Sequence, residues 1–508
     1  MSRRPSKRQH TGIPSFGAPS DADSPSSQQN SPSSSASSTR SLGFSAVPAL
    51  TTLCARVFVA NFLKLRNDEA AWETTAQQLR LLPDFLIPRL FAMLRRSWPT
   101  YLTHEFIVTY LLRGPSITLS SDLPGVKKGT ILDIPRLNAG VRELELSGFG
   151  EISDSTFASL LKRLPRLHAL VLRGCTKVGP ETARAAAEFC HDLKILNFSY
   201  TSVTPLSLAS LLIACPEVEV LKVAGIQNWT DATFANFLAG IGEGRNLPAL
   251  RTLKLRQTSL SDASVEAFLA LCPALQRLDV SFTLFRHPPK LLVHNGVPAL
   301  QKLSLTSTAV SGADLVIIVS LLPHLRTLAI GALGANRGSR PSIGNSSAMT
   351  MNDDTLRSLT AILEGFLFLE NLNLVGNTKL GQSAKTDRAL ADFITRVGRK
   401  CKRLNLAGIT SLRSSDLVGL TPTEEKGPSL LEFLILNNTG IDDEAGLYIA
   451  TCPSLTTLEV VGTKFTSEGV FPIIDSCTKL ENLDLTSCRG IRVMDRRRFF
   501  EVWEEARR

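Results

Sequence analysis

The stretch "CPALQRLDVSFT", residues 272–283, decides the fold because close variants of it return along the chain. Three of these variants are "CPEVEVLKVAGI" (215–226), "CPSLTTLEVVGT" (452–463) and "CTKLENLDLTSC" (477–488). All share the pattern φ-x-x-L-x-L, in which φ is an apolar residue and the last position is apolar. Side chains alternate along a β-strand, so both apolar residues of L-x-L point to the same side of a short strand. The pattern therefore predicts one strand in every copy.

The copies number thirteen, and most follow each other at about 25 residues, the spacing of leucine-rich repeats. One copy is too thin to bury both its strand and the apolar side of its helix, so neighbouring copies must stack on a continuous core. We therefore predict an α/β leucine-rich-repeat solenoid, a horseshoe of about thirteen repeats. The copies begin at Val141, Leu167, Leu193, Val218, Leu250, Leu275, Leu300, Leu325, Leu369, Cys401, Leu431, Leu455 and Leu480.

The rest of the chain divides by composition. Its first 44 residues are rich in Ser, Pro, Gln and Asn, with too few apolar residues to offset the entropy of ordering. From Val47 onward, apolar residues recur at helical spacing along one face, which predicts a small all-α domain. The predicted units are a disordered N-terminal tail (1–44), a helical domain (45–114), a linker or N-terminal cap (115–136), the solenoid (137–490) and a C-terminal capping helix (491–508).

Composition and charge narrow the class of protein. With 43% apolar and 20% charged residues, the chain is typical of soluble globular proteins. No run approaches the roughly 18 apolar residues of a membrane span, and no apolar segment follows the basic N-terminus. We therefore expect an intracellular protein, cytoplasmic, nuclear or both, with no membrane partner. The basic stretch "RRPSKR" (3–8) has two interpretations, a nuclear import signal or a solvated tail.

The cysteines and histidines argue against catalysis. Nine cysteines without a C-x-x-C pair predict reduced structural thiols rather than disulfides or a zinc site. The seven histidines show no metal-ligand spacing, and no H-E-x-x-H or G-x-S-x-G motif occurs. We therefore expect no enzyme activity, no catalytic or metal-binding residues and no cofactor. The cysteines that recur directly before a strand, where a small apolar group packs well, are Cys190, Cys215, Cys272, Cys401, Cys452 and Cys477.

Binding is the activity that the repeat pattern favours. The middle residue of L-x-L and its neighbours face the hollow of such a solenoid, and in the middle repeats they are basic. Converging guanidinium and ammonium groups predict binding of an acidic or phosphorylated protein client. A solvated charged face is the alternative interpretation, and the scarcity of aromatic residues argues against nucleic acid. The predicted client-binding residues are Arg173, Lys222, Lys254, Arg256, Arg277 and Lys302.

The repeats, with helices that end in Cys-Pro before the strand, resemble the cysteine-containing, ribonuclease-inhibitor-like repeats of F-box/leucine-rich-repeat proteins. In that family a small helical domain precedes the solenoid. The stretch "LPDFLIPRLFAML" (82–94) resembles the opening of an F-box. Pro88 departs from it, because a proline inside a helix costs about 3 kcal/mol unless it lies at a break. The residues that this resemblance places against a Skp-type adaptor are Leu82, Pro83, Phe85 and Leu86.

A second stretch, "ALTTLCARVF" (49–58), is similar to the elongin-binding box of cullin-ligase substrate receptors, with Ala49 where Ser, Thr or Pro is usual. The resemblance implies that Leu50, Cys54 and Phe58 bind an elongin-type adaptor, since an apolar helical stripe fits a groove. The alternative is that this stripe packs its helix onto its own domain. The whole arrangement is also similar to the leucine-rich-repeat protein of yeast nucleotide excision repair, itself associated with a cullin ligase.

These resemblances imply a non-catalytic substrate-recognition subunit of a cullin-RING (SCF-type) ubiquitin ligase, which promotes ubiquitin-dependent degradation of a client. The implied partners are a Skp-type or elongin-type adaptor, a cullin and the client. Two other hypotheses stay open. One is a DNA-repair or chromatin-associated scaffold that uses the basic hollow, and the other is a plain protein-interaction solenoid whose helical segment recruits nothing.

Overall fold

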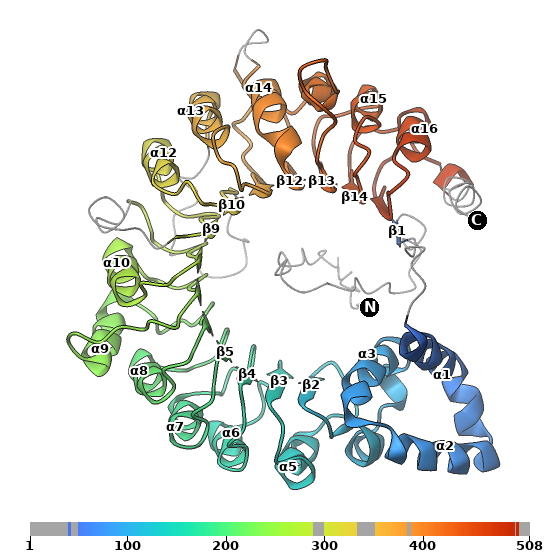
Figure 1. Ribbon diagram of the computed structural model, residues 1–508, viewed down its shortest axis with the longest axis vertical. Helices are drawn as coiled ribbons and strands as arrows, with labels where there is room; N and C mark the ends of the chain where they lie inside the picture. Colours follow the sequence, from blue (N-terminus) through green and yellow to red (C-terminus); the bar gives the residue numbers. More distant parts are fainter. Residues whose placement is uncertain are drawn as a thin grey trace, which may run out of the picture.

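The structure is a computed structural model that describes residues 39–41, 49–287, 299–332, 351–383, 388–492 and 494–496. Within these ranges the chain builds a curved sheet on the inside of an arc, with helices along its outside (Figure 1). The parallel strands are β2 (Ser116–Ser120), β3 (Glu143–Ser147), β4 (Ala169–Val171), β5 (Ile195–Asn197), β6 (Val220–Lys222), β7 (Thr252–Lys254), β8 (Arg277–Asp279), β9 (Lys302–Ser304), β10 (Thr327–Ala329), β11 (Asn371–Asn373), β12 (Arg403–Asn405), β13 (Phe433–Ile435), β14 (Thr457–Glu459) and β15 (Asn482–Asp484).

The strands follow one another in chain order, so each repeat pairs only with its two neighbours. Their first leucines stand in register, as when Leu253 pairs with Leu278 and Leu278 with Leu303. These leucines are almost fully buried. The predicted solenoid is therefore confirmed, and strands β3 to β15 lie at the thirteen predicted copies.

Strand β2 is a further parallel strand that the pattern missed. It lies in the segment predicted as a linker or N-terminal cap, and it pairs with β3 over five residues. Ile117 and Leu119 bury their side chains as an L-x-L pair would. The position of the first apolar residue of the pattern is occupied by Gly114, so the copy escapes a search for φ-x-x-L-x-L.

Helices cover the convex side of the sheet (Figure 1). Thr204 and Gly179 stand at the N-cap, directly before helices that begin with proline, a residue tolerated at the first helical position. The helices of the solenoid are α5 (Lys128–Leu137), α6 (Asp154–Leu161), α7 (Pro180–Phe189), α8 (Pro205–Ala214), α9 (Asp231–Ile241), α10 (Asp262–Leu271), α12 (Gly312–Ser320), α13 (Asp353–Leu363), α14 (Ala389–Arg396), η4 (Gly398–Lys400), η5 (Ser414–Leu420), α15 (Glu444–Ile449) and α16 (Ser467–Ser476).

Aspartates at helix starts tie neighbouring repeats together. Asp154 of α6 accepts hydrogen bonds from the backbone amides of Gly179 (2.8 Å), Glu181 (2.8 Å) and Thr182 (3.0 Å) at the start of α7. These amides have no partner inside their own helix. One carboxylate thus caps the helix of the next repeat, which fixes the stacking of two repeats from outside the core.

A buried polar side chain closes the turn after half of the described parallel strands. In Thr258 the hydroxyl donates to the carbonyl of Leu255 at 2.7 Å, and Asn377 does the same to Leu374 at 2.9 Å. Asn377 also donates to the carbonyl of Ile330 in the preceding repeat at 3.0 Å. The other threonines that donate to the carbonyl three residues back are Thr201, Thr283, Thr308, Thr439 and Thr463.

The N-terminal helical region covers the first end of the arc (Figure 1). An aromatic cluster holds it together: Phe62 meets Trp72 and Phe106 with ring centroids 6.0 and 5.7 Å apart. The guanidinium of Arg66 lies over this cluster, 5.8 Å from the centre of the Trp72 ring. The region contains α1 (Leu50–Asn67), α2 (Glu69–Leu81), η1 (Asp84–Leu86), α3 (Ile87–Ser97), η2 (Pro99–Tyr101), α4 (His104–Phe106) and the π-helical η3 (Ile107–Leu111).

One hydrophobic core runs from the helical region into the repeats without a break. Arg95 of α3 forms an ion pair with Asp122 just after β2 at 3.1 Å. Arg113 donates to the carbonyl of Arg80 at 2.8 Å and so joins α2 to the segment before β2. The helical region and the solenoid therefore form one packed body.

The tail differs from its prediction at one place. Thr39–Ser41 form strand β1, which pairs antiparallel with β15, whereas composition predicts disorder there. The reason is that β15 ends the sheet and offers unpaired backbone groups, which any extended segment can satisfy whatever its composition. The rest of the tail, and the aromatic residues of the predicted C-terminal capping helix, lie outside the described residues. No helix in the described ranges is long and apolar enough to span a membrane.

Candidate functional site

Helix α1 carries apolar residues on two opposite faces. Thr52, Val59 and Phe62 lie on the buried face and pack into the helical region. The opposite face bears the α1 strip, which we define as Leu50, Leu53, Cys54 and Val57. Leu50 is 75% exposed, Val57 63% and Leu53 37%, and Cys54 is exposed as well.

The exposure of the α1 strip bears on the two interpretations of this helix. A stripe that packs α1 onto its own domain should be buried, but Leu50 and Cys54 are not. Phe58, the third residue of the elongin-box resemblance, is half-buried and meets Phe62 edge-on at 5.9 Å. The exposed residues stand at i, i+3, i+4 and i+7, the spacing by which a helix enters an apolar groove.

The F-box-like segment has an irregular start. Pro88 lies in the first turn of α3, directly after the 3-10 turn η1, so it falls at the break where a proline is tolerated. Phe85 is 71% exposed and Pro83 is exposed. Leu82 and Leu86 are half-buried, and Leu82 packs against the core.

The six predicted cations all lie on or beside the inner strands of the arc. Arg173 and Arg277 are exposed, whereas the other four are half-buried. On adjacent strands Lys222 stands opposite Lys254, and Arg277 opposite Lys302. Like charges are thus brought together along β6 to β9, apart from Asp279, which stands opposite Lys254 on β8.

Two of these cations belong to a cluster whose other three residues sequence reasoning missed, the turn ledge, defined as Arg173, Tyr200, Arg256, Gln257 and Phe282. Its residues follow strands β4, β5, β7 and β8. The guanidinium of Arg173 lies over the Tyr200 ring at 5.8 Å, and that of Arg256 over the Phe282 ring at 4.8 Å. The Tyr200 hydroxyl donates to Oε1 of Gln257 at 2.6 Å. A signal existed in the sequence, because other copies have glycine where Tyr200, Gln257 and Phe282 stand.

The C-terminal half of the inner face has a different chemistry. Its polar side chains bond to their own sheet: Asn405 accepts from the amide of Ala407 at 3.0 Å, and Asn437 donates to Glu459 at 2.8 Å. Burial raises the pKa of Glu459, with the bond from Asn437 opposing this shift and the charge of Asp484 adding to it. These asparagines thus use part of their hydrogen-bonding capacity within the sheet, while Arg403 is exposed on β12 with its guanidinium 3.9 Å from the centre of the Phe433 ring.

Comparison with known proteins agrees with this architecture. A family model described as "Leucine Rich repeat" matches residues 451–473. The repeats of this chain are leucine-rich repeats. F-box/LRR-repeat protein 23 of Arabidopsis thaliana is 33% identical over 76 residues, which are 15% of this chain and 17% of that relative. The match thus spans about a sixth of the relative's length.

Two solved structures are also similar. The complex of Rad7 and Elc1 in yeast gives a TM-score of 0.46 at 16% identity, over 84% of this chain and 96% of the matched one. An internalin (InlF) of Listeria monocytogenes gives a TM-score of 0.39 at 17% identity, over 71% of this chain and 89% of the matched one.

The thiols of the leucine-rich repeats are buried packing groups. Burial raises the pKa of Cys190, Cys272, Cys401 and Cys477 to about 12. It raises that of Cys175, Cys215 and Cys452 to about 11. A thiol with such a pKa is neutral near pH 7 and a poor nucleophile. The six cysteines before strands therefore pack, as predicted.

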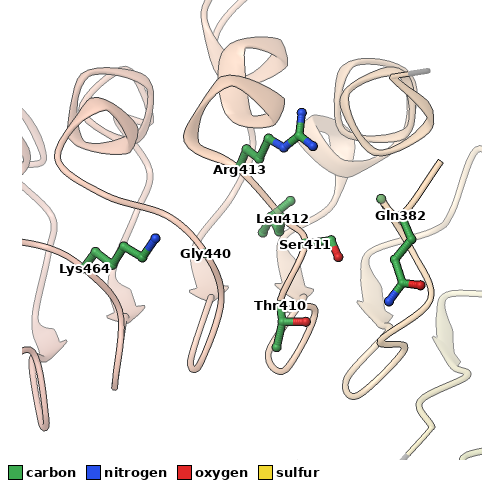
Figure 2. Close-up of a pocket in the computed structure, with 8 residues that line it drawn as sticks. Gln382, Thr410, Ser411, Leu412, Arg413, Gly440 and Lys464 are labelled. Carbon is green, nitrogen blue, oxygen red and sulfur yellow. The ribbon is translucent and has the colours of Figure 1, made fainter. Parts of the chain in front are cut away.

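A shallow polar pocket of about 550 Å³ lies in the loops that follow β11 to β14. Figure 2 shows Arg413 and Lys464 on two separate loops of it, with Lys464 extending toward the loop of Gly440. Both cations are exposed. The lining residues include no Asp, Glu, His or Cys. In the described ranges no three such residues gather to hold a metal ion.

Proposed function

We propose that this chain is a substrate receptor of a cullin-RING ubiquitin ligase, in which α1 docks an adaptor and the hollow of the solenoid holds a client. The single observation that carries the proposal is the α1 strip. Four exposed residues of one helix form it, on the face turned away from the core. Burying one Leu or Val side chain contributes about 1.5 to 3 kcal/mol of favourable free energy. Burial of this face in the groove of a partner would therefore stabilise the complex.

The class of partner comes from the resemblance to F-box/leucine-rich-repeat proteins and from the matching Arabidopsis relative. Two adaptor types fit different residues. An elongin-type adaptor takes the α1 strip, whereas a Skp-type adaptor takes the F-box-like segment with exposed Pro83 and Phe85. The α1 strip is the more regular surface, because one helix presents it at groove-binding spacing, so we favour the elongin type.

Such a receptor acts by position. The continuous core joins α1 to the repeats, so a client in the hollow is held at a fixed place relative to the adaptor. A client lysine is then brought near the ubiquitin-loaded enzyme, which replaces a bimolecular encounter by an effectively unimolecular one. No catalytic residue is required from this chain, and the reaction takes place in the cytoplasm or nucleus.

The test is reconstitution of the full chain with purified elongin-type and Skp-type adaptors, followed by size-exclusion chromatography. We expect a complex with the elongin type that the double variant Leu53→Asp/Val57→Asp abolishes. Arg56→Asp is the matched control, because Arg56 is an exposed residue of α1 outside the strip. The proposal is wrong if neither adaptor binds the folded chain.

A separate variant distinguishes the two adaptor types. Phe85→Asp should leave an elongin complex unchanged, since Phe85 lies in η1 and not on α1. If Phe85→Asp instead abolishes a Skp-type complex while the α1 variants bind normally, the F-box-like segment is the docking site. All variants must show the unfolding transition of the unmodified chain.

A further inference from the structure

Three turns of the ledge hold side chains in a backbone conformation that favours glycine. Tyr200, Gln257 and Phe282 have φ of 60°, 57° and 60°. Left-handed backbone costs an L-residue about 1 to 2 kcal/mol, and for a bulky residue it is a true outlier. Among the described residues, Tyr200 and Phe282 are the only aromatic residues with positive φ. The glycines at the equivalent position of other repeats are Gly148, Gly174, Gly225, Gly376, Gly408 and Gly462.

The Tyr200 ring is positioned by its neighbours on both sides. It packs on Gly225, where an added Cβ would lie 2.3 Å from Cε1 of the ring. Its hydroxyl then reaches Gln257, two repeats away from its own strand, at 2.6 Å. Glycine at 225 and the hydrogen bond together hold the ring flat along the ends of three strands.

The cations of the ledge are also held at a cost. The guanidinium of Arg256 lies over the Phe282 ring, and its Nε is buried without an acceptor among the described residues. A buried donor left unsatisfied costs about 1 to 3 kcal/mol. Beside the ledge, Lys222 and Lys254 stand opposite each other on neighbouring strands, an arrangement that like charges disfavour, and Asp279 of β8 stands opposite Lys254 on the other side.

Several unfavourable features therefore gather at β4 to β8, as happens where a structure is organised for binding. We propose that the turn ledge is the client site and takes an extended acidic or phosphorylated peptide running across the strands. A carboxylate or phosphate of the peptide accepts charge-assisted hydrogen bonds from Arg173 and Arg256. Five strands about 4.8 Å apart span roughly 19 Å, which is about six residues of extended chain. Naming the occupant a client rests on the proposed function.

The same contacts favour a peptide over single-stranded nucleic acid. Bases bind such surfaces by stacking on open aromatic faces. In this ledge Tyr200 packs on Gly225 and carries Arg173 over its ring, and Phe282 carries Arg256. The rings thus orient the two guanidiniums toward an anion and do not serve as stacking platforms.

Fluorescence polarisation with the full chain, without adaptor, tests the ledge. The probes are labelled degenerate peptide libraries centred on phosphoserine, glutamate or serine, and a single-stranded DNA of mixed sequence. We expect binding of the phosphoserine and glutamate libraries and none of the serine library. Arg173→Glu and Arg256→Gln should each weaken binding by about tenfold or more, the effect of losing one charge-assisted hydrogen bond. Tyr200→Phe keeps the ring and should weaken it less.

The matched control is Arg413→Glu/Lys464→Glu, which removes two exposed cations from the C-terminal half and should leave binding unchanged. The inference is overturned if the ledge variants, with unaltered unfolding midpoints, bind the acidic libraries like the unmodified chain. It is equally overturned if no acidic library binds, or if DNA binds more tightly than they do. Leu53→Asp/Val57→Asp should leave peptide binding intact, so failure of adaptor docking and failure of the ledge are distinguishable.

Discussion

The two halves of the inner face share one backbone design and differ in what they do with it. Around β4 to β8, left-handed turns carry Tyr200 and Phe282 beneath arginines. Around β11 to β14, the equivalent turns hold Gly376, Gly408, Asn438 and Gly462, and the strand asparagines bond to their own sheet. The first half places aromatic residues in left-handed turns, whereas the left-handed turns of the second half hold glycine or a small polar residue. The difference teaches that recognition can reside in a few repeats of a regular solenoid while the others serve stability.

The largest expected effect is the loss of stability when a turn-closing side chain is removed. We expect this loss to be larger for Asn377 of the C-terminal half than for Thr258 of the N-terminal half. Asn377→Ala removes donors to Ile330 and Leu374 and an acceptor for the amide of Met351. We expect it to lower the free energy of unfolding by about 3 kcal/mol, since three buried groups lose their partner. Thr258→Val removes one such bond and should cost about 1 kcal/mol. Urea denaturation measures both, and equal losses would contradict the account.

A pair of glycine substitutions separates strain from binding. Gly225→Ala places a Cβ into the Tyr200 ring and should cost about 2 kcal/mol, with loss of acidic-peptide binding. Gly408→Ala meets only Gly376 at 3.4 Å and should cost about 1 kcal/mol with no effect on the peptide. Thermal unfolding measures the loss of stability, and fluorescence polarisation measures the binding of the acidic peptides. If both variants bind alike, Tyr200 is not held by Gly225 in the way described.

The thiols should behave alike in both halves, because they belong to the shared core. Burial raises the pKa of Cys272 to about 12 and of Cys452 to about 11, from 9.0. The folded state thus keeps the proton longer, so the stability from each thiol is complete below pH 9 and is lost as pH rises through the folded pKa. At pH 10 the loss is about 1.4 kcal/mol per thiol.

Urea denaturation at pH 8 and pH 10 measures this loss. Cys272→Ala and Cys452→Ala should each show a smaller decline than the unmodified chain, and by a similar amount. A decline confined to one half would mean that the two cores differ. In the native protein, a thiol reagent should modify exposed Cys54 first.

The smallest effect is a trade between stability and binding. Gln257→Gly relieves a left-handed residue but loses the bond from Tyr200, so stability should change by less than about 0.5 kcal/mol. Peptide affinity should nevertheless fall, because Tyr200 loses its anchor. Asn438→Gly is the counterpart in the other half and should alter neither quantity noticeably, since Asn tolerates this conformation. Unchanged affinity in Gln257→Gly would argue against a role of that bond.

The sequence predicted the solenoid well because L-x-L must bury two side chains, whatever else varies. It did not reveal the turn ledge, since Tyr200, Gln257 and Phe282 lie beyond the leucine pattern, in a turn that only backbone angles identify. Aligning "LAGIT" (406–410) with "FSYTS" (198–202) would have shown an aromatic residue in a glycine position. Strand β1 was unpredictable from composition, because its pairing depends on the open edge of β15.

The apolar residues of α1 were visible in the sequence, but their direction was not. A stripe at helical spacing has the same letters whether it faces the core or solvent. Only packing of Val59 and Phe62 on the other side leaves Leu50 and Val57 outside.

The pairing of β1 with β15 sets an upper limit on the distance between the two ends of the arc. Ser41 is bonded to the last strand of the sheet, and only nine residue steps separate it from Leu50 at the start of α1. A chain of that length reaches no farther than about 30 Å. The two ends of the horseshoe are therefore tethered to each other, and the length of this segment limits how far they can separate. A larger separation of the two ends requires that β1 first detach from β15. A force applied to the N-terminus is therefore transmitted through β1 to the last repeat.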